Sequence, residues 1–60
     1  MLLFELYKVT PDSLTALICN RKHEVIYYGL LNNLDVDILQ SRVTYLDPIS
    51  AHELHIKLDI

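Results

Sequence analysis

Glu53-Leu54-His55-Ile56-Lys57-Leu58-Asp59-Ile60 alternates polar and apolar residues without interruption. Successive side chains of a β-strand point to opposite faces of its sheet, so this pattern predicts a strand over residues 53–60 with one buried face. The apolar side chains are expected to face a hydrophobic core; they are Leu54, Ile56, Leu58 and Ile60. The chain is therefore expected to be built around a sheet with one covered side.

Three further strands are predicted upstream of this one. The stretches 2–9, 14–19 and 23–30 are rich in apolar and aromatic residues, which favour strands. Polar segments separate them. Residues 10–13, Thr-Pro-Asp-Ser, are typical of a turn, and residues 20–22, Asn-Arg-Lys, are typical of a hairpin loop.

The same alternation assigns side chains to faces in these upstream strands. In the first of them, Leu2, Phe4 and Leu6 share one face, and Phe4 and Leu6 are expected to pack in the core beside Ile56. Gly29 stands near the end of the third strand, where it is expected to mark a bulge or an exit bend.

Residues 33–46 suit either a strand or a helix. Polar and apolar residues alternate at the start of this segment, as in a strand, but apolar residues are also spaced as on one side of a helix. We favour a helix. Asn33 is a good N-cap, and Asp35 and Asp37 would lie in the first turn, where the helix dipole favours negative charge. Pro48 would then end the helix. The predicted order is β-β-β-α-β, an α+β fold with a small antiparallel sheet and one α-helix.

The bulk composition predicts a single domain, residues 1–60, that associates with another chain. The chain is 52% apolar, yet a domain of this size hides only about 60% of the surface that its unfolded chain exposes. The surplus apolar surface predicts a homodimer. The single cysteine, Cys19, fits a reducing cytoplasm, and no apolar run is long enough to span a membrane.

No arrangement of residues predicts catalysis, a metal or a cofactor. His52 and His55 would point to opposite faces of a strand, which does not suit metal binding. Cys19 has no base near it in sequence and is expected to be a small buried hydrophobe. Asp35 and Asp37 would not face each other on a helix. The net charge of −3 argues against direct nucleic-acid binding. We expect a binding protein rather than an enzyme.

Three short motifs follow one another in the second half of the chain. They are Gly29-Leu30, then Asp35-Val36-Asp37-Ile38-Leu39, then Ala51-His52-Glu53-Leu54 followed by Lys57-Leu58-Asp59. In this order, and in a chain of this length and acidity, they resemble the small dimeric uracil-DNA glycosylase inhibitors of Bacillus phages. The resemblance implies a DNA mimic. Such a dimer acts in the cytoplasm of the host cell and presents acidic groups to the basic DNA cleft of the host enzyme.

The resemblance also implies roles for particular residues. Val36 would be the hydrophobic plug that enters the pocket around the enzyme's base-displacing loop, and Asp37 would be an acidic contact. The family has a large aromatic plug where this chain has Val36, and an aromatic where it has Gln40. The expected partner-binding residues are Glu24, Tyr28, Asp35, Val36, Asp37, Leu39 and Gln40.

The alternative is a small homodimeric structural or regulatory module that binds another host protein. A contiguous acidic ridge beside Val36 would favour the inhibitor, because a basic cleft attracts concentrated negative charge. A scattered pattern of charge would favour the module.

Overall fold

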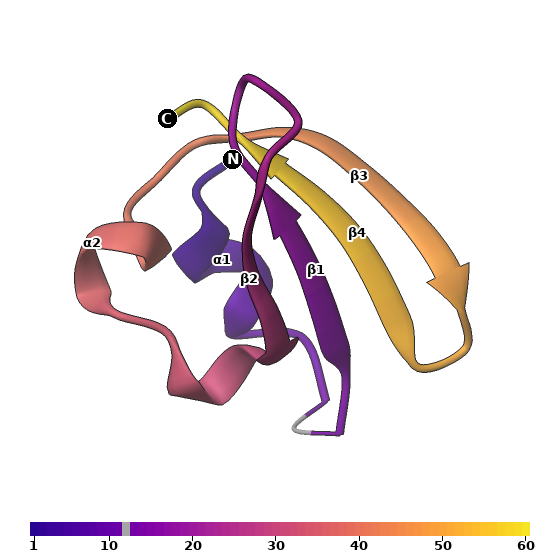
Figure 1. Ribbon diagram of the computed structural model, residues 1–60. Helices are drawn as coiled ribbons and strands as arrows, with labels where there is room; N and C mark the ends of the chain where they lie inside the picture. Colours follow the sequence, from indigo (N-terminus) through magenta and orange to yellow (C-terminus); the bar gives the residue numbers. More distant parts are fainter. Residues whose placement is uncertain (12) are drawn as a thin grey trace.

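The computed structural model describes residues 1–11 and 13–60 and forms a four-stranded sheet with its helices on one side (Figure 1). The predicted α+β class is confirmed. The predicted turn at 10–13 includes Asp12, which lies outside the described residues. In chain order, the elements are α1 (Leu3–Tyr7), β1 (Thr15–Cys19), β2 (Val25–Leu30), the 3-10 turn η1 (Leu31–Asn33), α2 (Val36–Leu39), β3 (Val43–Ser50) and β4 (Glu53–Leu58).

The sheet has the strand order β2-β1-β4-β3. β4 pairs in parallel with β1 and antiparallel with β3, while β1 and β2 form an antiparallel hairpin. The prediction of a purely antiparallel sheet is therefore wrong, and the sheet is mixed. β4 enters between β1 and β3, and a parallel pair of this kind needs a long connection. Here that connection contains β2, η1, α2 and β3.

The core lies between the helices and one face of the sheet. It is made of Leu3, Ala16, Ile18, Leu31, Ile56 and Leu58. The predicted buried face of the last strand is confirmed: Ile56 and Leu58 are fully buried, and Leu54 packs against the cluster. Ile60 is different, because it follows the end of β4 and is exposed.

The predicted strand at 2–9 is wrong, because this segment forms the helix α1. An apolar run suits either element, and here the helical spacing i, i+3, i+4 decides which side chains meet the core. Those side chains are Leu3, Leu6 and Tyr7. Phe4 consequently points away from the core and is 44% exposed, so its predicted core position is also wrong. Glu5 Oε1 accepts a hydrogen bond from the backbone N–H of Leu2 at 2.9 Å, which satisfies a free donor at the start of the helix.

The predicted helix at 33–46 is reduced to the single turn of α2, and the segment after it forms β3. Asn33 ends η1 instead of capping a helix, and Asp35 occupies the N-cap position with extended backbone. β3 opens with Val, Thr and Tyr, which favour strands. Pro48 lies within β3 rather than ending a helix. A proline is tolerated there because β3 is an edge strand.

The predicted hairpin of β1 and β2 is confirmed, but its loop covers residues 20–24 rather than 20–22, so that β2 begins at Val25 and not at His23. Its irregularity also lies elsewhere than expected. The register shifts between Ile18 and Cys19, not at Gly29. Gly29 has a φ of 154°, and a Cβ there would lie 3.2 Å from the hydroxyl of Tyr27. The backbone angle favours glycine at this position, and a Cβ there would also crowd the ring of Tyr27.

Candidate protein-binding site

An apolar groove of about 320 Å³ lies where α1 and α2 meet. It is lined by Leu2, Phe4, Val36, Leu39 and Gln40. Because the helical turn of α1 directs Leu3 into the core, Phe4 lies on the outer side of the helix. Val36, the first residue of α2, is 66% exposed. Large apolar side chains that stay this exposed beside a groove are typical of a surface that binds another protein.

Main-chain hydrogen bonds hold the two walls of the groove together. The backbone N–H of Leu3 donates to the carbonyl oxygen of Ser41 at 2.9 Å, and the N–H of Val43 donates to the carbonyl of Met1 at 2.8 Å. Leu2 and Arg42 form an antiparallel β-bridge. These contacts join the chain before α1 to the chain after α2, so the groove is fixed by the backbone rather than by side chains alone.

Three carboxylates are sequence neighbours of residues that line the groove, although none of them lines it. Asp35 and Asp37 are exposed on either side of Val36 along the chain, and Glu5 belongs to α1. Two basic residues are also close: Arg42 is bridged to Leu2, and Lys8 Nζ lies 5.2 Å from the centroid of the Phe4 ring. The groove thus combines an apolar lining with charged residues of both signs nearby.

The structure brings most of the predicted site residues together. Val36, Leu39 and Gln40 line the groove, and the two aspartates lie in the same turn of chain. Glu24 belongs instead to the β1–β2 loop, where its carboxylate accepts a hydrogen bond from Asn20 Nδ2 at 3.0 Å.

Tyr28 lies on the other face of the sheet. It is paired with Leu17, whose neighbours on β1, Ala16 and Ile18, point into the core. Its hydroxyl donates to Glu53 Oε2 at 3.3 Å. A partner that fills the groove would therefore not reach Tyr28 without extending around the edge of the sheet.

Leu2 and Phe4 are groove residues that the sequence pattern did not reveal. The strand prediction placed Phe4 in the core, so it was not considered as a contact. Two features of the sequence indicate the helix that exposes Phe4. Leu3, Leu6 and Tyr7 have helical spacing, and Glu5 stands three residues after Leu2, as in the capping of a helix start.

The cysteine and the histidines occupy other places. Cys19 is buried, as predicted, but it does have a neighbouring base: its Sγ lies 3.5 Å from His55 Nε2, because β1 and β4 are adjacent. His52 lies in the turn between β3 and β4 and is exposed. Within residues 1–11 and 13–60, no group of three or more His, Cys, Asp or Glu side chains is placed to hold a metal ion.

Comparisons with protein-family models, with curated proteins and with solved structures find no match to this chain. None of the helices in the described part of the chain has the length and apolar character needed to cross a membrane.

Proposed function

We propose that this protein inhibits a host uracil-DNA glycosylase by occupying its DNA-binding cleft. The observation that carries the proposal is the exposed Val36, placed between two exposed aspartates at the rim of an apolar groove. Acidic groups speed association with a basic cleft, and a desolvated apolar anchor slows dissociation. Such an inhibitor needs shape and charge but no chemistry of its own.

Phe4 strengthens the apolar part of this proposal. The family that the chain resembles has a large aromatic plug, whereas Val36 is small. In the structure, Phe4 lies in the same groove as Val36 and is 44% exposed. Side chains from α1 and α2 together offer the aromatic surface that Val36 alone lacks. The groove between them has room for an apolar side chain of the enzyme.

The test is an assay of uracil excision from DNA in the presence of the purified protein. We expect a stoichiometric block of excision. Charge reversal by Asp37→Lys should weaken the block without unfolding the protein, because an exposed charge in the first turn of a helix contributes at most about 1 kcal/mol to stability. Asp47→Lys is the matched control, because Asp47 is also an exposed aspartate but lies on β3 and not beside Val36.

Raising the salt concentration should also weaken the block, since exposed charges are screened beyond about 8 Å at physiological ionic strength. A folded sample that leaves excision unchanged at excess inhibitor would refute the proposal. An equal loss of inhibition in the Asp37 and Asp47 variants would refute the assignment of the groove as the contact surface.

The second candidate is a small homodimeric regulatory or structural module that binds another host protein. One observation favours it: several carboxylates lie away from the groove, in the β1–β2 loop, on β3 and β4 and beyond β4. They are Glu24, Asp47, Glu53 and Asp59. Capture from a bacterial lysate separates the two functions. The module predicts a bound protein other than the glycosylase, and Val36→Asp should release that protein if the groove binds it.

A further inference from the structure

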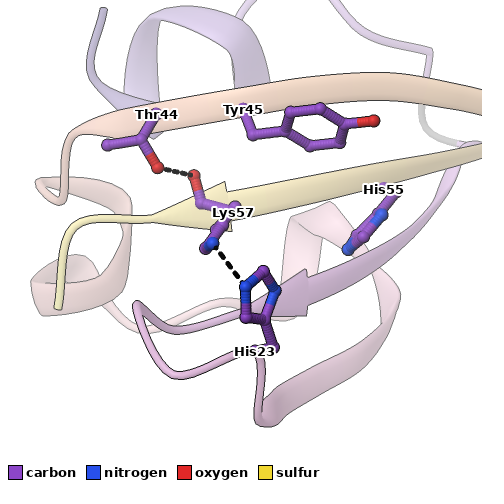
Figure 2. Close-up of a pocket in the computed structure, with 5 residues that line it drawn as sticks. All are labelled: His23, Thr44, Tyr45, His55 and Lys57. Carbon is purple, nitrogen blue, oxygen red and sulfur yellow. Dashed lines mark hydrogen bonds between the residues drawn. The ribbon is translucent and has the colours of Figure 1, made fainter.

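A second hollow, of about 470 Å³, lies over β4 and β3 (Figure 2). It is lined by His23, Thr44, Tyr45, His55 and Lys57. On β4, His55 and Lys57 alternate with the buried Ile56 and Leu58, so they point to the face of the sheet that α1 and α2 do not cover. This hollow is therefore separate from the groove between the helices.

The lining of the hollow is basic in a chain whose net charge is −3. It contains Lys57 and two histidines and no carboxylate. Among residues 1–11 and 13–60, the only ion pair within 4.0 Å joins Arg21 to Asp59. The ammonium group of Lys57 is therefore not neutralised by a described carboxylate. Its Nζ lies 3.0 Å from His23 Nε2, where the ammonium group donates to the ring nitrogen.

His23 is held over the sheet by an uncommon backbone conformation. Its φ is 65°, which is unusual for a residue other than glycine, although histidine adopts it more often than most. Asn20 stabilises the loop: its Oδ1 accepts hydrogen bonds from the backbone N–H groups of Lys22 at 2.9 Å and Glu24 at 3.0 Å. The loop thus places one imidazole directly against Lys57.

His55 is positioned by neighbours on both sides. Its Nε2 lies 3.5 Å from Cys19 Sγ on β1, and its ring meets the ring of Tyr45 edge-on, with centroids 5.5 Å apart. Thr44 donates a hydrogen bond to the carbonyl oxygen of Lys57 at 3.2 Å, which fixes the local pairing of β3 with β4. Each nitrogen-bearing side chain of the hollow therefore contacts a neighbouring side chain.

We propose that this hollow binds a phosphate group. Lys57 supplies the charge, His55 and the Nδ1–H of His23 supply further donors, because Nε2 of His23 accepts from Lys57, and Tyr45 forms an aromatic wall. Charge-assisted hydrogen bonds of this kind are the stronger ones in proteins. Converging donors from a loop and a strand suit an anion with several oxygen atoms. Asp47, the partner of His55 in the register of β3 and β4, opposes the anion and limits its affinity.

The experiment is an NMR titration of amide resonances with inorganic phosphate, with chloride keeping the ionic strength constant. We expect saturable shifts at residue 23 and at residues 55–57. Lys57→Met should weaken binding about tenfold or more, because a hydrogen bond to a charged group is lost. Lys22→Met is the matched control, since Lys22 lies beside His23 in the β1–β2 loop but does not line the hollow. This variant should bind phosphate as tightly as the parent protein does.

His23→Asn gives a second variant, because asparagine tolerates the same positive φ and preserves the loop. His23→Asn should also weaken phosphate binding, and it tests the proposal if Lys57→Met does not fold. A parallel titration with phenyl phosphate identifies the ligand: tighter binding than inorganic phosphate indicates an aromatic ester that contacts Tyr45, and equal binding indicates free phosphate. Shifts that do not saturate, or that persist unchanged in both variants, would overturn the proposal.

Discussion

Ile56 is the residue on which the packing of the sheet depends most directly. It is fully buried and lies on the central strand β4, paired with Ile18 of β1 on one side and Leu46 of β3 on the other. Ile18 and Ile56 belong to the same core cluster as Leu3 of α1. A change at this single position therefore affects the contact between the sheet and the helix that covers it.

Ile56→Ala should lower the free energy of unfolding by about 2–5 kcal/mol, because the removed methyl groups leave a cavity in a packed core. Ile49→Ala is the control, since Ile49 is 52% exposed on β3, and surface changes of this kind usually stay within about 0.5 kcal/mol. Urea denaturation of the two variants provides the measurement. Similar losses at both positions would show that β4 does not present this face to the core.

At the scale of the elements, the strands with the clearest local signals were the ones that the sequence predicted. The alternation of β4, and the hairpin loop between β1 and β2, are encoded over a few neighbouring residues. α1 was missed because it is a single short helix whose apolar run also suits a strand. β3 was missed because aspartates that suit a helix start precede residues that suit a strand.

The parallel pairing of β1 with β4 could not be predicted, because no local pattern records which distant strands become neighbours. For the same reason, the sequence did not predict which distant residues meet in the groove and in the hollow. The residues of α2 were found from a continuous motif, whereas Phe4 reaches the groove only because α1 is helical. Likewise, Cys19 meets His55 only because their strands are adjacent in the sheet.

The stability of a Phe4→Ser variant distinguishes the helix α1 from the strand predicted over residues 2–9. With Phe4 on the outer side of α1, stability should fall by no more than about 1 kcal/mol, whereas truncation of a core phenylalanine costs roughly 3–5 kcal/mol. Inhibition of uracil excision should nevertheless weaken about tenfold or more if the groove is the contact surface, as loss of a central aromatic anchor does in other interfaces.

Leu3→Ala serves as the comparison for Phe4→Ser, because Leu3 is fully buried in the same helix. It should lower stability by about 2–5 kcal/mol. Thermal or urea unfolding gives both values, and the excision assay is run below the unfolding transition. A larger loss of stability at Phe4 than at Leu3 would contradict the helical geometry of α1.

For the whole molecule, the two edges of the sheet differ in a way that bears on association. β3 carries Asp47 and Pro48, and its pairing with β4 is interrupted by two register shifts. Charges, prolines and bulges are features that keep an edge strand from pairing with another chain. β2 has one register shift in its pairing with β1, but Val25–Leu30 contains no charged residue and no proline.

β2 also exposes much apolar surface for an edge strand. Its exposed large side chains are Val25, Ile26, Tyr28 and Leu30. Two copies of a chain with a net charge of −3 repel one another, and an uncharged strand is the place where they can meet with least repulsion. Antiparallel pairing of β2 with β2 of a second copy would join the two sheets and satisfy the free backbone groups of both edges.

The expected homodimer should therefore depend on β2 and not on β3. Antiparallel pairing about the middle of β2 brings the two copies of Tyr28 close together, so Tyr28→Lys would oppose two like charges across the pair. Because Tyr28 is 61% exposed, the fold itself should tolerate the change. Sedimentation at micromolar concentration should show twice the chain mass for the parent and for Ile49→Lys on β3, but a monomer for Tyr28→Lys. A monomeric parent, or a dimer lost only in the β3 variant, would contradict this arrangement.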